Sequence, residues 1–252
     1  MNARVTIGEL GAGLPANLFT PALARHEERL PFTVRVATSE RQLGKAVSLR
    51  HRAYGRHVPA LGELLRQPEA KDNEPGCVVL LAESKLDGEP LGTMRIQTNR
   101  YAPLAIEASV PLPASFAGCS LAEATRLGVA VGRVGRVVKT MLFKALYLYC
   151  VEQGIEWMVI GARAPLDRMY EGLLFTDVFP GQPYFPLKHA SDIPHRILAL
   201  EIDTADARWR AARHPMYDLY VNTRHPDIDI RETGFRFGFG MKQAQVAAGI
   251  AA

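Results

Sequence analysis

The chain has 252 residues, of which 48% are hydrophobic and 22% are charged, and its 30 basic residues exceed its 26 acidic ones for a formal net charge of +4. This composition is too apolar for a disordered chain and is sufficient for one large domain with its own core. A charge of +4 spread over this length, with no basic block interleaved with aromatic residues, does not favour a nucleic-acid-binding surface.

Cysteine usage and hydropathy favour a protein of the reducing cytoplasm. The three cysteines, Cys77, Cys119 and Cys150, are odd in number and form no C-x-x-C pair, so neither a disulfide framework nor a zinc site is expected. The seven histidines show no metal-ligand spacing, and we predict no metal and no bound cofactor. Residues 1–20 do not read as a signal peptide, and the most apolar run, 141–151, is too short to span a bilayer.

The N-terminal half predicts strands and helices in alternation. In chain order, we expect a strand at 32–37, a helix from the N-cap Ser39 to Gly55, a short helix at 61–66, strands at 77–83 and 91–97, and a loop at 100–120. The dipeptide Asp87-Gly88 between the later two strands is a strong signal for an antiparallel hairpin.

The C-terminal half continues the same alternation. We expect a strand at 121–131, a helix from the turn at 132–136 to Gln153, a strand at 155–161, a helix at 164–175, a strand at 197–202 and a helix at 205–223. This order predicts an α/β fold with a mixed central sheet flanked by helices. We divide the chain into an N-terminal arm (1–30), a single domain (31–228) and a C-terminal tail (229–252).

A glycine turn lies between the strand at 121–131 and the long helix. Its glycines, Gly132 and Gly135, can expose backbone N–H groups at a helix N-terminus, where an anion such as a phosphate binds. Arg133, Arg136 and Lys139 stand beside them. The spacing is neither a P-loop nor a dinucleotide fingerprint. A purely steric role for the two glycines is the alternative.

The tetrapeptide Glu123-Ala124-Thr125-Arg126 precedes an interior glycine, Gly128, in the same strand. In a regular strand Glu123 and Thr125 share one face and Arg126 takes the other, so Glu123 and Arg126 converge only at a bulge or a strand end. Interior glycines often mark such bulges. An exposed edge with salt bridges is the alternative.

Several short motifs occur in a defined order between residues 32 and 228. They are Ser48-Leu49-Arg50-His51-Arg52-Ala53-Tyr54, Asp72, Met94-Arg95, Glu123-Ala124-Thr125-Arg126, the glycine turn, Met169-Tyr170 before Phe175, His214-Pro215-Met216-Tyr217 and His225-Pro226-Asp227-Ile228. Together they resemble the GNAT superfamily of N-acyltransferases. Within it, the chain is similar to the FeeM-like N-acyl amino acid synthases and to the related acyl-homoserine-lactone (autoinducer) synthases.

The resemblance implies a GNAT-like acyltransferase fold and a reaction. A fatty acyl group would move from the phosphopantetheine thioester of acyl carrier protein to the amine of an amino acid. The expected partners are therefore acyl carrier protein and the amino acid, with no nucleic acid, no membrane span and only peripheral membrane contact through the acyl product. The acyl-phosphopantetheine thioester is a co-substrate, with acyl-coenzyme A as a second possible donor.

The resemblance also implies a charged cluster around the amine substrate. Glu123 is expected to act as the base that removes a proton from the amine, directly or through one water. Asp72, with Glu69 as a second acidic position, would orient the ammonium group or an arginine. Arg50 or Arg95 would bind the substrate carboxylate through a bidentate pair. Arg126 matches the same substrate-binding set, and a structural ion-pair network is the alternative for these residues.

Three further roles complete the expected site. Tyr170 lies near the position at which GNAT enzymes often keep a tyrosine that protonates the leaving thiolate. Backbone N–H groups at 128–131 would stabilise the oxyanion. The phosphate of the pantetheine arm would bind at the glycine turn, whose cations would receive the acidic acyl carrier protein.

The chain departs from its relatives at three places. Autoinducer synthases usually carry a tryptophan shortly after the first motif, but the tryptophans here are Trp157 and Trp209, which counts against a lactone product. The glycine turn lacks the [QR]-x-x-G-x-[GA] pattern of coenzyme A users, and Leu174 replaces the usual glycine before Phe175. The alternatives are an acyl-homoserine-lactone synthase, an acetyl-coenzyme A-dependent acetyltransferase of small amines, and a non-enzymatic module that binds small anions or nucleic acid.

Overall fold

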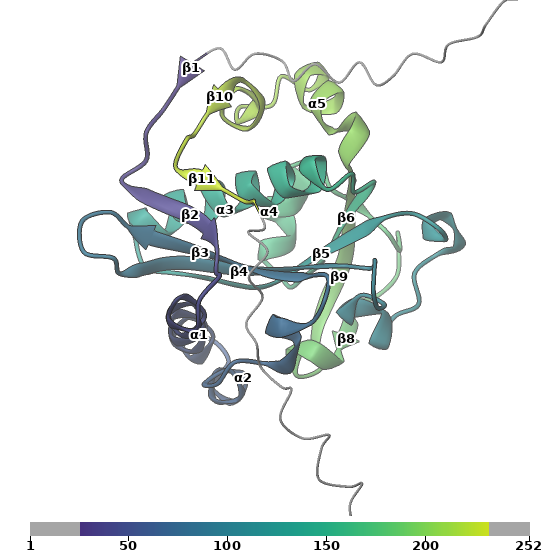
Figure 1. Cartoon of the computed structure of the whole chain (residues 1–252). Helices are drawn as coiled ribbons and strands as arrows, with labels where there is room; N and C mark the ends of the chain where they lie inside the picture. The colour runs from purple at the N-terminus through teal and green to yellow at the C-terminus, as the bar shows by residue number, and fades with distance from the viewer. Residues whose placement is uncertain (1–25, 232–252) are drawn as a thin grey trace, which may run out of the picture.

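The computed structural model describes residues 26–231, which form a mixed sheet with helices on both faces (Figure 1). Most of the predicted arm at 1–30 and of the predicted tail at 229–252 lies outside the described residues. Between residues 26 and 231, no helix is long and apolar enough to cross a membrane.

The central sheet has nine strands in the order β11-β2-β3-β4-β5-β6-β9-β7, and β8 also pairs with β9. Its strands are β2 (Phe32–Val36), β3 (Cys77–Ser84), β4 (Pro90–Thr98), β5 (Leu121–Val129), β6 (Trp157–Ala162), β7 (Thr176–Asp177), β8 (Phe185–Leu187), β9 (Ile193–Glu201) and β11 (Ile228–Asp229). Strands β2 to β5 are antiparallel neighbours, whereas β5 and β6 are parallel. The predicted mixed sheet is confirmed.

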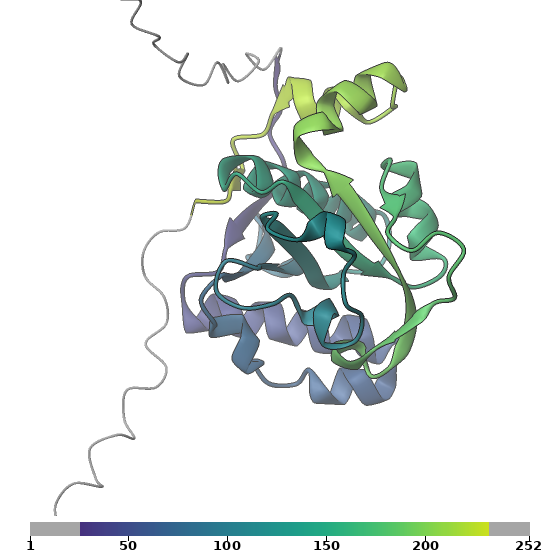
Figure 2. The ribbon, with the colours of Figure 1, turned by 90° about the vertical axis from the view of Figure 1, so that its right-hand side faces the viewer.

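Helices cover both faces of this sheet. They are α1 (Glu40–Gly55), α2 (Pro59–Leu64), α3 (Arg133–Glu152), α4 (Leu166–Gly172) and α5 (Ile202–Ala211). Figure 1 shows α1 and α2 on one face and α3 and α5 on the other. Figure 2, turned by 90°, shows the same three layers. The main core lies between the sheet and α3, whose inward residues Val138, Met141, Leu142, Ala145 and Leu146 recur at helical spacing.

Local signals placed several elements correctly. Ser39 caps α1 by accepting a hydrogen bond from the backbone N–H of Gln42, and the Gln42 side chain accepts in return from the Ser39 backbone. The hairpin between β3 and β4 turns at Gly88, which has φ +70°. The expected loop at 100–120 contains two 3-10 turns, η2 (Ala105–Ala108) and η3 (Ala114–Phe116).

The predicted helix at 205–223 is wrong. Helix α5 ends at Ala211, and a separate π-helical turn, η5, occupies Asp218–Asn222. Pro215 explains the break, because proline lacks a backbone N–H and disfavours helical geometry at the residue before it. The other bounds differ by smaller amounts: β5 ends at Val129 rather than 131, and α4 ends three residues before Phe175.

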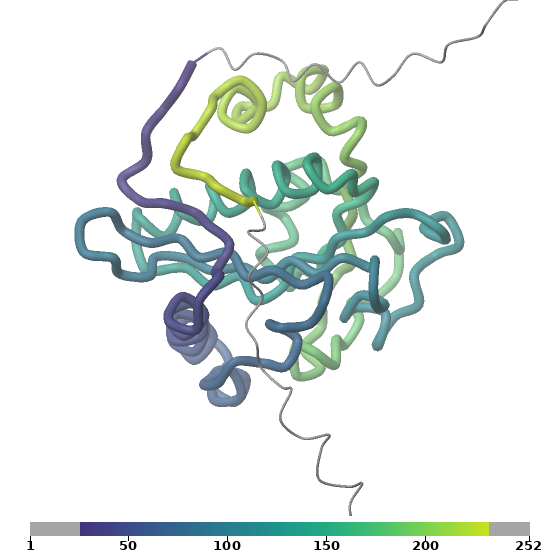
Figure 3. Tube along the Cα trace, viewed as in Figure 1, coloured from purple at the N-terminus to yellow at the C-terminus, as the bar shows by residue number. Residues whose placement is uncertain are grey.

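The two ends of the described chain lie side by side (Figure 3). Strand β11 pairs with β2, and the short strands β1 (His26–Glu27) and β10 (Thr223–Arg224) pair with each other. Asp227 accepts a hydrogen bond from the backbone N–H of Leu30. Lys144 of α3 donates hydrogen bonds to the carbonyls of Leu219 and Thr223. These bonds hold the C-terminal segment of the described chain against α3.

Candidate active site

A bulge in β5 shapes the centre of the molecule. Arg95 of β4 pairs with Thr125, whereas Thr93 pairs with Gly128, so β5 has one residue more than its partner between these two pairs. Arg126 lies at the extra position with φ +56°, in the left-handed region. From the sequence, either a bulge or a strand end was required for Glu123 and Arg126 to converge, and the structure contains the bulge.

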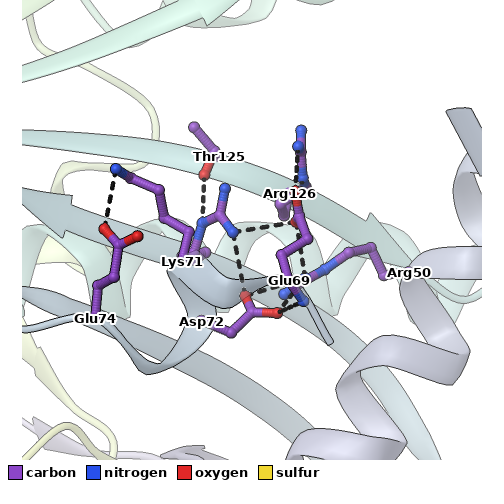
Figure 4. Close-up of polar contacts among 8 residues, drawn as sticks. Arg50, Glu69, Lys71, Asp72, Glu74, Thr125 and Arg126 are labelled. Carbon is purple, nitrogen blue, oxygen red and sulfur yellow. Dashed lines mark hydrogen bonds and ion pairs between the residues drawn. The ribbon is translucent and has the colours of Figure 1, made fainter. Parts of the chain in front are cut away.

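The bulge places Arg126 in a buried ion cluster, drawn in Figure 4. Arg126 forms a bidentate pair with Glu69, with both N···O distances at 2.7 Å. Arg95 Nη1 lies 3.1 Å from Glu69 and 3.2 Å from Asp72. Arg50 Nη1 lies 3.0 and 3.1 Å from the two oxygens of Asp72. Three guanidinium groups thus share two carboxylates, and we call these five residues the ion cluster.

The electrostatics of the ion cluster favour its charged form. Burial alone would raise the pKa of Glu69, but the hydrogen bond from Arg126 and the charges of the three arginines outweigh it and lower that pKa to about 2. The Asp72 and Arg50 side chains are fully buried. Arg50 Nε and Nη2 have no hydrogen-bond partner among the described residues. With three arginines and two acidic residues, the cluster has a formal charge of +1.

Glu123 occupies a different environment on the same strand. It is 0% exposed, and its Oε2 accepts a hydrogen bond from the backbone N–H of Ile106 at 3.1 Å. Its Oε1 has no hydrogen-bond partner within the described part of the chain, and the nearest cation-capable group is His189 Nε2 at 3.6 Å. Burial raises the pKa of Glu123 to about 7, although the Ile106 N–H and the charge of Arg95 oppose the shift. A carboxyl group with this pKa can exchange protons near neutrality.

A cavity of about 260 Å³ opens where β5 and β6 separate. Their parallel pairing ends at Glu123 and Val159, and the later residues of β5 line the cavity together with the end of β6. The charged and titratable residues of the lining are Tyr54, Arg56, His57, Arg126, Lys139, Arg163, Tyr170, His189 and His195. The lining contains four arginine or lysine side chains and no carboxylate, so the cavity suits a ligand with a negative group.

Tyr170 faces this cavity from α4. Burial raises the pKa of its phenol. Its ring packs edge-on against Phe143 and Phe175, with centroids 5.1 and 5.3 Å away. Leu174, which replaces the usual glycine, has φ +65° and thus adopts the backbone conformation that glycine favours. The departure in sequence leaves this turn geometry in place.

The glycine turn at the start of α3 combines two backbone requirements. Gly132 has φ +89° and ψ −157°, a conformation almost restricted to glycine. A Cβ on Gly135 would lie 1.8 Å from the Ala130 carbonyl oxygen, so only glycine fits there. Arg133 and Arg136 are exposed and have no ion pair in the described structure, whereas Lys139 lines the cavity. The steric role of the glycines is therefore real, and the cations beside them are unpaired.

The structure thus places the sequence-predicted residues in three groups. Arg50, Asp72, Arg95 and Arg126 meet in the ion cluster with Glu69, Glu123 lies beyond Thr125 on the same strand, and the glycine turn lies at the far end of β5. One expected oxyanion donor is excluded, because the Ala130 N–H donates to the Leu91 carbonyl at 2.8 Å.

Sequence reasoning missed six charged or titratable residues of the cavity, which are Tyr54, Arg56, His57, Arg163, His189 and His195. Tyr54 belongs to the first quoted motif, but no role was assigned to it. Arg56, Arg163 and His189 belong to no motif, and His189 lies in the short turn η4 (Lys188–Ala190). Only the folded sheet brings these side chains to one cavity, so no spacing in the sequence could have indicated them.

Comparisons with known proteins identify the family and the fold of the chain. A family model described as N-acyl amino acid synthase FeeM matches residues 45–191. The structure of FeeM, an N-acyl amino acid synthase from uncultured soil microbes, is 15% identical with a TM-score of 0.56, over 72% of this chain and 97% of that chain. BjaI, a coenzyme A-dependent acyl-homoserine lactone synthase, is 18% identical with a TM-score of 0.52, over 77% and 93% of the two chains.

A protein from Lactobacillus plantarum described as an N-acetyltransferase is 15% identical with a TM-score of 0.50, over 69% of this chain and 99% of that chain. A search of curated proteins finds no match. The structural likenesses confirm the predicted GNAT-like fold. Because the family model covers more than half of the sequence, the chain belongs to the FeeM family of N-acyl amino acid synthases and is a GNAT-type acyltransferase.

Proposed function

We propose that the protein transfers a fatty acyl group from the thioester of acyl carrier protein to the α-amine of an amino acid. The observation that carries this proposal is the cavity between β5 and β6, which is lined by four cationic side chains and no carboxylate. An amino acid substrate brings a carboxylate, and a pantetheine arm brings a phosphate, so both reactants supply an anion.

Amide formation needs a base. The α-amine of a free amino acid is mostly protonated at neutral pH and must lose a proton before its nitrogen can attack the thioester carbonyl. Glu123, whose pKa is about 7, is matched to this task near neutral pH. After the C–N bond forms, the nitrogen gives up its second proton, the C–S bond breaks, and Tyr170 gives a proton to the departing thiolate. Of the two protons that the nitrogen loses, one restores Tyr170 and the other passes to solvent.

The ion cluster supplies the carboxylate site in this proposal. Of its three arginines, Arg126 lines the cavity, while Arg50 and Arg95 lie behind it. Arg50 keeps two nitrogens without a partner among residues 26–231. We therefore assign the first contact with the substrate carboxylate to Arg126, with Arg50 behind it. Arg95 and Asp72 hold the cluster together.

The donor is assigned from the surface around the glycine turn. Arg133 and Arg136 are exposed, form no ion pair within residues 26–231, and lie beside a helix N-terminus without acidic residues in its first turn. An acidic carrier protein is attracted by such a surface, whereas coenzyme A brings no protein surface of its own. A reducing compartment such as the cytoplasm agrees with the three free cysteines.

Mass spectrometry of reaction products tests this function. The purified full-length protein is incubated with acyl carrier protein or coenzyme A that bears the same acyl chain, together with isotope-labelled amino acids. We expect a new N-acyl amino acid and preference for the carrier protein. Labelled S-adenosylmethionine is tested in parallel, since a labelled lactone would instead identify an acyl-homoserine-lactone synthase. Lipid extracts of bacteria that express the chain provide the cellular counterpart.

A further inference from the structure

We propose that Tyr54 and Arg126 together bind the carboxylate of the amine substrate, so that the enzyme selects amines that carry this group. The inference rests on the proposed acyl transfer to an amine and adds a binding residue, Tyr54, to which the sequence motifs gave no role. Tyr54 belongs to α1 and Arg126 to β5, and both line the cavity between β5 and β6.

The hydroxyl group of Tyr54 is accessible and has no partner. The Tyr54 side chain is half-buried and forms no hydrogen bond within residues 26–231. The buried polar atoms that lack a partner in this part of the chain do not include its hydroxyl, so the hydroxyl retains accessible surface. Because Tyr54 lines the cavity, this hydroxyl can donate a hydrogen bond to a ligand bound there.

Arg126 also has a nitrogen available for a ligand. Its Nε and Nη2 atoms both donate to Glu69 at 2.7 Å, and this bidentate pair fixes the plane of the guanidinium group. The third nitrogen, Nη1, forms no hydrogen bond among the described residues and is not one of the buried atoms without a partner. Nη1 is therefore an accessible donor whose orientation is set before any ligand binds.

The two groups lie close enough to influence each other. Burial raises the pKa of Tyr54, and among the charges that oppose this shift that of Arg126 has the largest effect. The Tyr54 phenol in turn adds to the effect of burial in raising the pKa of Tyr170, which lines the same cavity. The Tyr54 hydroxyl thus lies on the cavity side of the ion cluster. Since its pKa is raised, it stays protonated at neutral pH and acts as a donor.

Packing between α1 and β5 fixes the position of Tyr54 beside the bulge. A Cβ on Gly128 would lie 3.2 Å from the Cβ of Ala53, so glycine at this position allows α1 to approach β5 closely. Two residues after Tyr54, Arg56 Nη2 donates to the carbonyl of Val129 at 3.0 Å. The end of α1 is therefore held against β5 on both sides of Tyr54.

A carboxylate matches this pair of donors. Its two oxygens can accept one hydrogen bond from Nη1 of Arg126 and one from the hydroxyl of Tyr54. The ion cluster has a formal charge of +1, which a bound carboxylate would neutralise. The phosphate of a pantetheine arm has separate cations at the glycine turn, at the far end of β5. An amine without a carboxylate would leave both donors unpaired and should bind more weakly.

The kinetic test uses Tyr54→Phe, which keeps the ring and removes the hydroxyl. Hydrogen bonds to charged groups are among the stronger ones, so we expect KM for the amino acid to rise about 10- to 100-fold while kcat changes only a few-fold. The ratio of kcat/KM for the amino acid to that for the matching amine without a carboxylate should fall by the same factor. Tyr101→Phe is the control, because Tyr101 is exposed and does not line the cavity.

Two kinetic results would overturn the proposal. In one, kcat of Tyr54→Phe falls while KM for the amino acid stays unchanged, which would place the hydroxyl at the reacting thioester. In the other, the variant loses the same factor with the amino acid and with the matching amine, which would show that the hydroxyl does not recognise the carboxylate. A loss of stability alone would affect both substrates equally and is therefore separated from recognition.

A second test does not depend on acyl transfer. The full-length protein is labelled with ¹³C at the tyrosine Cζ atom, and the Tyr54 signal is assigned by its loss in Tyr54→Phe. The standard amino acids are added one at a time, and each one that binds is compared with its matching amine. We expect the Tyr54 signal to shift with the amino acid and not with the amine. Absence of a shift with every amino acid would overturn the proposal. A shift in a protein that forms no acylated amine would instead place the failure in the proposed function.

Discussion

Two glutamates in neighbouring parts of this molecule, the half-buried Glu69 and the fully buried Glu123, have opposite acid–base properties. Glu69 has both oxygens on guanidinium groups, and its pKa is about 2. Glu123 lies on the strand that also carries Arg126, has one oxygen without a partner among the described residues, and its pKa is about 7. Burial raises the pKa of both groups, so the low pKa of Glu69 comes from its arginine partners, which Glu123 lacks within hydrogen-bond distance.

This difference separates a scaffold from a reactive group. Burial disfavours ionised carboxylates, and it is offset where guanidinium groups surround the carboxylate. At Glu69 the arginines more than offset the cost of burial, so this carboxylate stays ionised throughout the physiological range. At Glu123 the hydrogen bonds and the arginine charges offset the effect of burial only in part, so the carboxyl group changes its protonation near neutrality. Pairs of acids driven apart in this way often mark acid–base sites.

The largest effect should follow from Glu123→Gln. Glutamine keeps the size and the acceptor oxygen for the Ile106 N–H but cannot take a proton. We expect acyl transfer to fall about 10²- to 10⁴-fold with the fold retained. Single-turnover rates and circular dichroism of the purified variant measure both parts. A folded variant that turns over within a few-fold of the parent would remove Glu123 from the mechanism.

Asp72→Asn should instead act on stability. The carboxylate of Asp72 compensates the positive charges of Arg50 and Arg95, whose side chains are almost fully buried. The asparagine variant lacks this negative charge, so the two buried guanidinium groups lose that compensation. Breaking buried pairs of this kind costs about 3–5 kcal/mol of unfolding free energy. Urea denaturation measures the loss, with Glu63→Gln as a control that removes an exposed pair with Arg66 and costs under about 1 kcal/mol. Equal small effects of both substitutions would contradict a structural role for the cluster.

Stability should depend on pH in opposite ways at the two glutamates. The folded pKa of Glu69 lies below its ordinary value of 4.5, so its stabilisation is complete above pH 4.5 and is lost as the pH falls towards 2. The folded pKa of Glu123 lies above 4.5, so its contribution is present below pH 4.5 and is lost as the pH rises to about 7.

Urea denaturation between pH 2 and 8 measures these contributions. We expect Glu123→Gln to abolish a decline of at most about 3 kcal/mol between pH 4.5 and 7. Glu69→Gln should leave that decline in place and change only the acid limb. Parallel curves for Glu123→Gln and the parent would show that Glu123 has an ordinary pKa.

The smallest effect should come from the exposed arginines at α3. The double variant Arg133→Ala/Arg136→Ala should raise the apparent KM for acyl carrier protein about three- to tenfold with little change in kcat, because surface charges mainly affect the association rate. Salt should weaken the parent in the same direction. Acyl-coenzyme A is the comparison donor, and Arg41→Ala, an exposed arginine in the first turn of α1, controls for general loss of charge. An unchanged KM in a stable variant would refute the docking role.

Sequence reasoning reached most of the fold because local signals determine it. The cap at Ser39, the turn at Gly88 and the apolar runs of the strands depend on neighbours a few residues away. The helix expected at 205–223 failed because Pro215 was not weighed against the apolar pattern. The bulge at Arg126 was recognised as a requirement, but its position follows from the register with β4, which no single strand reveals.

Sequence reasoning predicted only those site residues that belong to recognisable motifs. Arg50, Asp72, Arg95 and Arg126 belong to quoted motifs, and the fold brings them within hydrogen-bond distance of shared partners. His189 was missed because a short turn has no periodicity, and its proximity to Glu123 accompanies the packing of η4 against η2. Long-range contacts of this kind are set by tertiary structure.

The pairing of the two chain ends also has a consequence for the order of folding. Leu30 and Asp227, which are hydrogen-bonded, are separated by 197 residues. At about 5–20 residues per second, a ribosome makes β2 roughly 10 to 40 s before β11 is available to pair with it. During that interval the outer edge of β2 presents unpaired backbone groups to other chains. The nascent protein is therefore most exposed to aggregation before residues 223–229 emerge and cover that edge.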